Sequence, residues 1–381
     1  MRVRGLNTLI GIFIFPFIGS AQQNYEIKIV FPESVDLKKM SVSVDNGIDN
    51  SDLFPIYKNN SAILSGRYYS RYPVLRFIYP LTKHKLSIKT FFIDGGKGEV
   101  KFVDSHSPDV LEKFTSVNAI EEYKYSGAKE LKDFVHQEEK VSDEFVNKYR
   151  DEVFDNDSLL DILNELDRKV LDKQLDFIKK NGDWYYSFWF FKDRLIGNPN
   201  TFDADTLLSV FNSSFPNELQ NSVEGREVRK LLEGRTIKRY ALAPDFTSKT
   251  YDGKLVKLSD MKGRFVMLDF WASWCGPCIE LMPEIRKVRE RFPAEQVEII
   301  SVSRDKDTSA FLKNIEKHGM TWLNILTDPN VYKSYGGRFL PDVYIIDREG
   351  KIIYRGQTDD RVDYVTFLEA EMKKPIGSAK L

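Results

Sequence analysis

The sequence predicts an α/β fold at the C-terminus, with a mixed central sheet flanked by helices, preceded by a small antiparallel β domain and a helical region. Strand periodicity is concentrated in residues 25–103, and helical periodicity dominates residues 110–235. From residue 246 onward strand and helix patterns alternate, which is typical of a central sheet covered on both faces. We therefore expect four segments: a signal peptide at 1–21, an antiparallel β domain at 22–108, a helical domain at 109–235 and the α/β domain at 236–381.

The overall charge excludes some classes of partner. The 56 basic and 57 acidic residues give a formal net charge of −1. A nearly neutral chain has no large basic field with which to attract nucleic acid, so we expect no nucleic-acid partner. Aromatic residues make up 13% of the chain, which indicates large rings in the cores or on a binding face.

The first residues have the pattern of an export signal. Arg2 and Arg4 precede an uncharged stretch at 6–19, and the small residues Gly19-Ser20-Ala21 follow it. We expect cleavage after Ala21 and a location in the periplasm or cell envelope. The alternative is an uncleaved membrane anchor, although the stretch is short for a membrane span and contains a proline.

The β domain is predicted from short segments rich in β-branched and aromatic residues. Ile27 and Ile29 alternate with charged residues, and Asn46-Gly47 is a turn signal after a short strand. Further strands are expected at 74–78, 87–93 and 100–103. This domain contains no group of residues that suggests catalysis.

The helical region contains one long amphipathic segment, at residues 158–180. An aromatic run at 184–191 follows it, for which a buried helix is favoured over a surface that binds apolar clients. Gly234 has the sequence context of a helix cap, and the basic residues 235–239 are expected to form a linker to the next domain.

The C-terminal domain is predicted element by element. Its strands and helices are expected in the following order: a hairpin at 246–258 turning at Asp252-Gly253, a strand at 265–270, a helix at 279–292, a strand at 297–302, a helix at 307–318 closed by Gly319, a strand at 323–326, a hairpin of 343–346 with 352–354, and a helix at 362–372.

Cys275 and Cys278 are the two cysteines of the chain. Two thiols three positions apart at the start of a helix suit dithiol–disulfide exchange, because the helix N-terminus favours a thiolate. A zinc site is the main alternative, and it lacks ligands: there is no second cysteine pair, and the histidines show no paired spacing (His84, His106, His136, His318). A pair of buried, inert thiols is the other alternative. We expect no metal and no cofactor.

Residues 243–355 resemble the thioredoxin superfamily, and specifically the exported TlpA/ResA-like thiol–disulfide oxidoreductases. The resemblance lies in a Trp-Cys-Gly-Pro-Cys sequence at 274–278 behind an apolar strand and in the segments 243–246, 258–264 and 339–347. It implies a thioredoxin-like fold for residues 236–381. The order of β domain, helical region and thioredoxin-like domain also resembles that of multidomain cell-envelope members.

The resemblance implies a role for each thiol. Cys275 would be the nucleophile that forms a mixed disulfide, and Cys278 would resolve it, leaving a Cys275–Cys278 disulfide. Asp269 lies in the preceding apolar strand, where an acid in thioredoxins exchanges a proton with the buried cysteine, so we predict a general acid/base role towards Cys278. The alternative is a solvated acid on an edge strand.

The resemblance also implies a surface that faces the substrate. Pro341 matches the cis-proline of the family, and the backbone of Leu340 would pair with an extended substrate. Trp274, Gly276 and Pro277 would lie beside it. Asp342 occupies a position that is often threonine in the family, which puts substrate preference in question.

The dipeptide between the cysteines bears on the direction of electron flow. Strongly oxidising sites stabilise their thiolate with a polar or cationic residue between the cysteines, whereas Gly276-Pro277 adds no charge. We therefore predict a reductase of disulfide-containing client proteins. An unidentified membrane or periplasmic electron donor would keep it reduced. Two alternatives are a scaffold in which residues 22–235 recruit a partner, and a thiol peroxidase. The peroxidase would need a hydroxyl residue at position 272, which is alanine.

Overall fold

The computed structural model describes residues 22–48, 50–82, 86–104, 109–121, 129–150, 152–197, 202–337, 339–356 and 358–375. The predicted signal peptide, His84 and His106 lie outside the described residues. The chain divides into two compact units, one of residues 1–166, 184–187 and 216–225, the other of residues 167–183, 188–215 and 226–381. Within the described ranges, no helix has the length and apolarity needed to cross a membrane.

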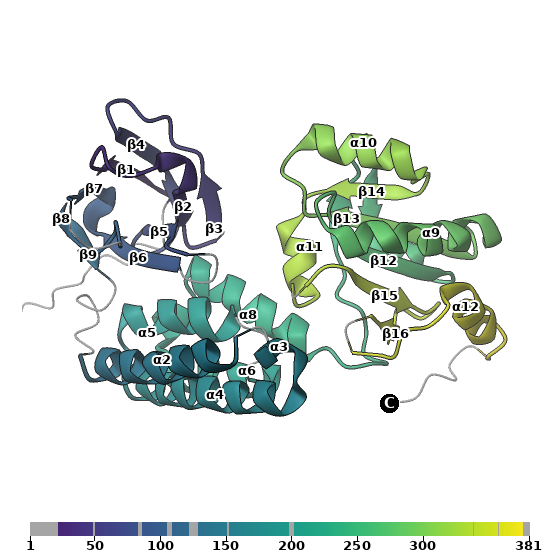
Figure 1. Ribbon diagram of the computed structural model, residues 1–381. Helices are drawn as coiled ribbons and strands as arrows, with labels where there is room; N and C mark the ends of the chain where they lie inside the picture. The colour runs from purple at the N-terminus through teal and green to yellow at the C-terminus, as the bar shows by residue number, and fades with distance from the viewer. Residues whose placement is uncertain are drawn as a thin grey trace, which may run out of the picture. The chain divides into compact units, whose positions relative to one another are not determined.

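The first unit contains two β-sheets (Figure 1). One has the order β4-β1-β7-β8 and the other the order β3-β2-β5-β6-β9. The elements are β1 Gln23–Val30, η1 Leu37–Lys39, β2 Ser41–Asp45, β3 Asn50–Leu53, β4 Ser61–Tyr68, β5 Val74–Pro80, β6 Leu86–Ile93, η2 Asp94–Gly96, β7 Lys97–Phe102, β8 Phe114–Val117 and β9 Ala119–Glu121. Alternate residues of both sheets enter one shared core, as strand periodicity requires.

Aromatic rings fill the centre of this core. Phe102 stacks on Phe31 with ring centroids 5.1 Å apart and meets Phe77 edge-on at 5.0 Å. All three rings are buried, and rings of this size contribute much of the apolar area that stabilises a small sandwich.

Two features of the β domain differ from the sequence prediction. β1 and β7 pair in parallel, so the domain is not wholly antiparallel. Between β1 and β7 the chain forms strands of the second sheet, and β7 then runs in the same direction as β1. The alternation of apolar residues does not encode the direction of a strand relative to its neighbour. In addition, β8 and β9 follow residue 108, so strand structure continues into a segment that was expected to be helical.

Helices follow β9, and the helix predicted at 158–180 corresponds to α4. The elements are α2 Lys129–Tyr149, α3 Glu152–Asp155, α4 Asp157–Lys180, α5 Tyr185–Phe190, η3 Phe191–Ile196, α6 Ala204–Ser214, α7 Asn217–Gln220 and α8 Val223–Thr236. The aromatic side chains of residues 185–191 are buried, whereas Trp184 is 41% exposed. The run therefore forms a buried helix and not a surface for apolar clients.

The predicted linker at 235–239 begins two residues later than expected, after α8 ends at Thr236. Gly234 lies inside α8, which continues to Thr236, and Arg235 is buried. A glycine followed by basic residues is a common signal for a helix end. Here Gly234 and Arg235 instead make tertiary contacts, and the helix continues past them.

The second unit contains a five-stranded mixed sheet of order β14-β13-β12-β15-β16 (Figure 1). β12, β13 and β14 run parallel, and β15 and β16 are antiparallel to their neighbours. The elements are β10 Thr247–Lys249, β11 Leu255–Lys257, η4 Leu258–Met261, β12 Phe265–Trp271, α9 Gly276–Arg291, β13 Val297–Ser303, α10 Thr308–His318, β14 Leu323–Leu326, α11 Pro329–Ser334, β15 Asp342–Ile346, β16 Ile352–Arg355 and α12 Tyr364–Met372. This is the α/β fold class that the sequence predicts.

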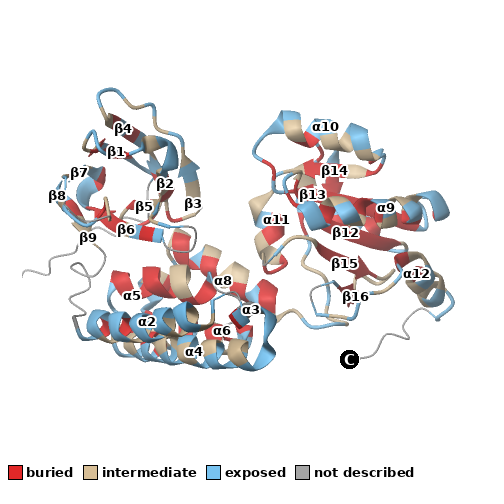
Figure 2. Cartoon of the chain, viewed as in Figure 1, coloured by how far each residue is buried: buried red, intermediate tan, exposed pale blue. Residues whose placement is uncertain are grey.

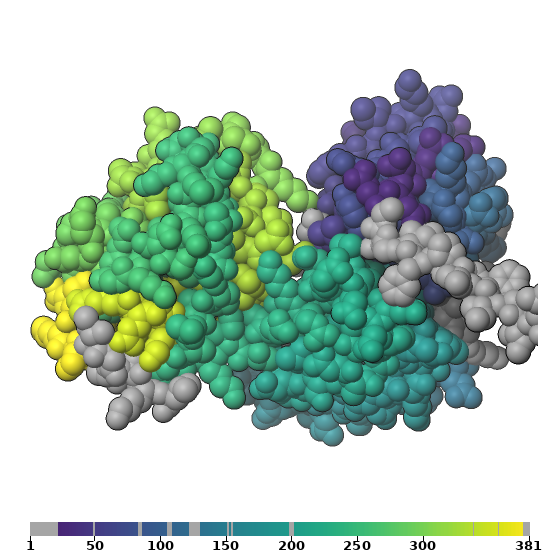
Figure 3. Space-filling model, turned by 180° about the vertical axis from the view of Figure 1, so that it is seen from behind, coloured from purple at the N-terminus to yellow at the C-terminus, as the bar shows by residue number. Residues whose placement is uncertain are grey.

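The central strands are buried on both faces, as the red strands in Figure 2 show. Met267 and Trp271 of β12 pack on the face covered by α9, and Leu268 and Phe270 pack on the opposite face. On the side shown in Figure 3, yellow atoms of the C-terminal segment adjoin green atoms of the same unit, in agreement with the packing of α12 against α9.

The short helix α11 was not predicted. Asp328 caps it by accepting hydrogen bonds from the backbone N–H groups of Asn330 and Val331, and Pro329 occupies its first turn. An acidic cap followed by proline is a helix-start signal that could have located this helix. Gly319 ends α10 in the left-handed conformation with φ of 58°, as predicted for a terminal glycine.

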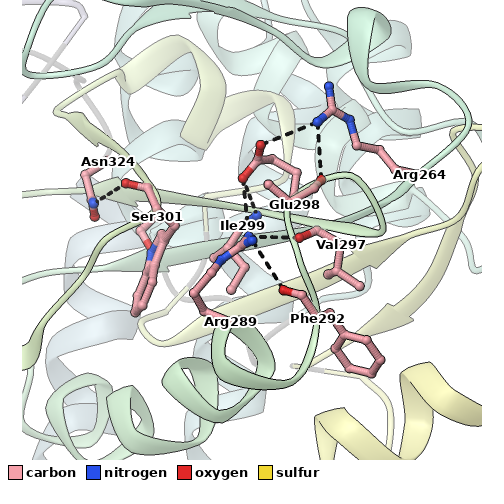
Figure 4. A network of polar contacts seen from close by, with 10 residues as sticks. Arg264, Arg289, Phe292, Val297, Glu298, Ile299, Ser301 and Asn324 are labelled. Atoms are coloured by element: carbon pink, nitrogen blue, oxygen red, sulfur yellow. Dashed lines mark hydrogen bonds and ion pairs between the residues drawn. The ribbon is translucent and has the colours of Figure 1, made fainter.

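A buried ion network joins the end of α9 to the start of β13 (Figure 4). The Arg289 guanidinium donates to the Val297 carbonyl at 2.8 Å and lies 3.3 Å from the Glu298 carboxylate. Arg264 approaches the same carboxylate at 3.6 Å. Because this network fixes α9 against the sheet, it also holds the opposite end of that helix, where the cysteines lie.

We predict that Glu298→Ala lowers the free energy of unfolding by about 2 kcal/mol, because it leaves Arg289, whose side chain is 17% exposed, without its counter-ion. Urea unfolding followed by circular dichroism measures the loss. Arg361→Ala is the control, since Arg361 pairs with Glu284 with 77% of its side chain exposed. The control should cost about 0.5 kcal/mol or less, and equal losses in both variants would contradict the prediction.

Candidate active site

The two cysteines lie where β12 passes into α9. Cys275 is the N-cap of α9, and Cys278 lies in its first turn. The structure joins them in a disulfide with Cα atoms 5.3 Å apart, and the Cys278 backbone N–H points to the Cys275 sulfur at 3.3 Å. Both residues are buried, with 6% of Cys275 and none of Cys278 exposed, so Cys275 is the more accessible of the two.

The local sequence explains why a helix begins at this point. Pro277 occupies the first turn, where its missing N–H costs no hydrogen bond, and Gly276 has open space around its Cα. The Cys278 backbone N–H, in the first turn of α9, points to the Cys275 sulfur and carries partial positive charge. It would stabilise a Cys275 thiolate after reduction.

A buried carboxylate holds the turn before Cys275. Asp305 accepts hydrogen bonds from the Ser273 backbone N–H at 2.9 Å and from its hydroxyl at 2.6 Å. The Ser303 hydroxyl donates to the same carboxylate at 2.7 Å. Asp305 is 2% exposed, and these three donors replace the water that burial removes. The loop that presents Cys275 is therefore anchored to the end of β13.

Asp269 lies in the central strand and not on an edge, because β12 is flanked by β13 and β15. This placement excludes the solvated edge-strand alternative. Asp269 falls between Met267 and Trp271, whose side chains enter the core that also contains Cys278. Strand alternation therefore directs the Asp269 carboxylate to the same face of the sheet as the buried cysteine.

Burial governs the protonation of Asp269. Its side chain is fully buried, and desolvation raises its pKa from 3.8 to about 7, with a hydrogen bond from Ser301 opposing the shift and the charge of Asp342 adding to it. The Ser301 hydroxyl donates to the carboxylate at 3.0 Å and accepts from the Trp322 indole N–H at 2.8 Å. Among the described residues, no donor reaches the other carboxylate oxygen.

The predicted substrate-facing loop has a cis peptide bond between Leu340 and Pro341. Asp342 pairs with Phe270 across the sheet, so the proline lies next to the end of β12, beside the loop that leads to Cys275. Leu340 packs against the core cluster that contains both cysteines. Trp274 is 69% exposed, so apolar surface lies next to the disulfide.

The structure thus brings the predicted residues to one end of the sheet, and it adds others that sequence reasoning missed. Asp305, Ser301 and Trp322 were not predicted. A signal existed for the first two, because Ser301, Ser303 and Asp305 are polar residues at alternate positions in or just after a buried strand. Over the ranges that the structure describes, no cluster of three or more histidine, cysteine or acidic side chains could hold a metal ion.

Comparison with known proteins relates the C-terminal part of the chain to redox proteins. A family model described as Redoxin matches residues 239–372. The thiol-disulfide oxidoreductase ResA of Bacillus subtilis (strain 168) is 33% identical over 112 residues, which are 29% of this chain and 63% of that protein. The thioredoxin-like protein YneN of the same strain is 31% identical over 134 residues, or 34% of this chain and 75% of that protein.

Each similarity covers about a third of this chain, and the ResA proteins are themselves matched over only part of their length. The chain spans 65% or less of the length of the ResA proteins of Bacillus anthracis and Bacillus subtilis. A crystal structure of the thioredoxin domain of a thiol-disulfide oxidoreductase from Bacteroides vulgatus is 28% identical and covers 36% of this chain and 99% of that one, with a TM-score of 0.33. A score at that level supports no statement about the fold of the whole chain.

We predict that Asp269→Asn stabilises the oxidised protein at pH 8 by about 4 kcal/mol and has little effect at pH 4. Because folding raises the pKa of Asp269 from 3.8 to about 7, the unfolded chain loses this proton first as the pH rises. As the pH rises from 3.8 to about 7, ionisation of Asp269 therefore lowers the free energy of unfolding of the wild type. The asparagine variant has no ionisable group at this position, so its stability does not fall for this reason. Urea unfolding across the pH range measures the difference between the two proteins.

Ser301→Ala provides the matched test of this assignment. Removing the hydrogen bond that lowers the pKa of Asp269 should extend the pH-dependent window to higher pH. A stability difference between wild type and Asp269→Asn that does not vary with pH would show that Asp269 is ionised in the folded protein.

We also predict that Asp305→Ala lowers the free energy of unfolding by about 2 to 3 kcal/mol, because the Ser273 backbone N–H and two hydroxyl groups lose their acceptor. Thermal and urea unfolding measure the loss. Asp307→Ala is the control, since Asp307 only caps α10, and it should cost about 1 kcal/mol. Equal effects of the two substitutions would argue against the loop anchor.

Proposed function

The chain belongs, through residues 239–372, to the thioredoxin superfamily and its ResA/TlpA-like thiol–disulfide oxidoreductases, and we propose that it reduces disulfides in cell-envelope proteins with Cys275 and Cys278 as its redox pair. The observation that carries this proposal is the disulfide itself, in which Cys275 caps the helix N-terminus with 6% of the residue exposed and Cys278 is fully buried. This asymmetry suits a nucleophile and a resolving thiol.

The reaction transfers two electrons to the client. The Cys275 thiolate attacks one sulfur of the client disulfide, which breaks that bond, forms a mixed disulfide and releases one client thiolate. The Cys278 thiolate then attacks the Cys275 sulfur, releases the second client thiolate and leaves the Cys275–Cys278 disulfide. A dithiol electron donor must reduce this disulfide again before the next turnover.

Asp269 has a role in the second step. Cys278 is fully buried, so its thiol needs a nearby base before it can attack. The Asp269 carboxylate shares the face of the sheet with that thiol, and its pKa of about 7 allows it to take and return a proton near neutral pH. The Ser301 hydroxyl holds one carboxylate oxygen and is itself held by the Trp322 indole N–H.

The reductive direction rests on the residues between the cysteines. Gly276 and Pro277 contribute no charge that would hold Cys275 as a thiolate. Reductases of the thioredoxin type have reduction potentials of about −270 mV, whereas strong oxidants have potentials of about −120 mV. The N-terminal sequence supports export to the compartment where client disulfides form. Peroxidase activity is disfavoured, because Ala272 has no hydroxyl group with which to bind peroxide.

We predict that Cys275→Ser abolishes the reduction of insulin disulfides, since the attacking sulfur is lost, and that Cys278→Ser accumulates mixed disulfides through Cys275. Insulin precipitation and non-reducing gels measure the two effects. Thr358→Ser, a conservative change outside the site, is the control and should retain activity. Full insulin reduction by Cys275→Ser would refute the proposed function.

A further inference from the structure

The C-terminal end of α8 packs closely against the segment that leads to the cis-proline. A Cβ atom on Gly234 would lie 2.4 Å from the Gly336 nitrogen and 2.7 Å from the carbonyl oxygens of Lys333 and Ser334. Only glycine permits this approach of two backbones. The glycine that resembled a helix cap in the sequence is therefore a contact point between the helical region and the redox domain.

Arg235 joins the same two regions by hydrogen bonds. Its guanidinium donates to the Gly336 carbonyl at 3.0 Å and to the Ile196 carbonyl, at the end of η3, at 2.9 Å. The side chain is buried, with 9% of the residue exposed. The planar guanidinium holds both acceptors at fixed positions, which one ammonium group cannot do.

An ion pair and a chain of tyrosines complete the contact. Lys333 of α11 lies 2.6 Å from Glu227 of α8, and both side chains are mostly buried. The Tyr335 hydroxyl donates to the Pro244 carbonyl at 2.9 Å, and the Tyr344 hydroxyl donates to the Tyr335 carbonyl at 2.7 Å. Residues 333–336 are therefore held from the helical side and from the sheet side together.

Gly336 precedes the cis bond at Leu340–Pro341 by a few residues, and it has a φ of 90°, which side-chain-bearing residues rarely adopt. Gly337 follows with a φ of 47°. Two consecutive glycines in the left-handed region leave the backbone with many other accessible conformations, so the contacts from α8 select the observed one. The Tyr335 carbonyl, next to Gly336, also accepts the hydrogen bond from Tyr344 of β15, and β15 begins at Asp342, directly after Pro341. The contacts from α8 thus reach the cis-proline through this hydrogen bond.

We propose that Arg235 and Gly234 are positioning residues for the backbone at Leu340-Pro341, so that the helical region determines how well the redox site accepts a polypeptide disulfide. The proposal rests on the proposed reductase function. An extended polypeptide pairs its backbone with such a segment, whereas a small disulfide has no backbone to pair. Loss of the contact should therefore impair polypeptide substrates selectively.

The experiment compares two oxidants of the prereduced full-length protein. Stopped-flow tryptophan fluorescence follows oxidation by insulin and by bis(hydroxyethyl) disulfide, for wild type, Arg235→Lys and Glu227→Gln. Lys230→Ala is the matched control, because Lys230 lies on the same helix and donates to the Asn330 side chain of α11 at 3.3 Å, away from Gly336. Circular dichroism and the Cys275–Cys278 redox potential are measured for every variant.

We expect Arg235→Lys to lower the rate constant for insulin about ten-fold through weaker binding, because small misplacements of a positioning group have large effects on rate. Oxidation by bis(hydroxyethyl) disulfide, the redox potential and the control should stay at wild-type values. Glu227→Gln should change the insulin rate in the same direction, and it decides the question if Arg235→Lys does not fold.

Two results would overturn the inference. One is an unchanged insulin rate in the folded variants, and the other is an equal loss with both oxidants, which would indicate general damage to the domain. A wild-type protein that reacts with bis(hydroxyethyl) disulfide but not with insulin would instead refute the proposed function as a protein reductase, so the two failures are distinguishable.

Discussion

Burial of the strand β12 on both faces is the constraint on which the redox site depends. Every residue of this strand is buried, including Asp269, and its last residue leads directly into the loop that presents Cys275. A strand in the centre of a sheet is held by hydrogen bonds to two neighbours, so its end is a rigid support for a reactive group. The same burial removes water from Cys278, so the proposed reaction requires an internal base.

Two buried carboxylates near this end of the sheet illustrate opposite solutions to desolvation. Asp305 accepts three hydrogen bonds from Ser273 and Ser303, which lets it remain buried as an anchor. Asp269 receives one hydrogen bond, from Ser301, and its pKa rises to about 7. The number of donors thus separates a structural acid from one suited to proton transfer. The ion network at Glu298 holds the far end of the same strand and helix.

The helical region differs from a passive spacer in the way that it meets the redox domain. α8 approaches so closely that glycine is required at position 234, and Arg235 spans carbonyl groups from η3 and from the loop after α11. Because that loop contains two glycines in the left-handed region, outside contacts restrict it more than its own sequence does. Substrate selection by the redox domain would then depend on residues that precede it in the chain.

The sequence by itself located the candidate redox pair and predicted most of the C-terminal fold, because these features are local. Two cysteines with adjacent spacing, apolar runs such as 265–270 and the caps around Gly319 carry their signals within a few residues. Tertiary structure alone decided the parallel pairing of β1 with β7, the Ser273–Asp305 anchor across 32 positions and the Arg235–Gly336 contact across 101. Alternation and spacing report which face a residue occupies, but they do not identify the distant partner that meets it there.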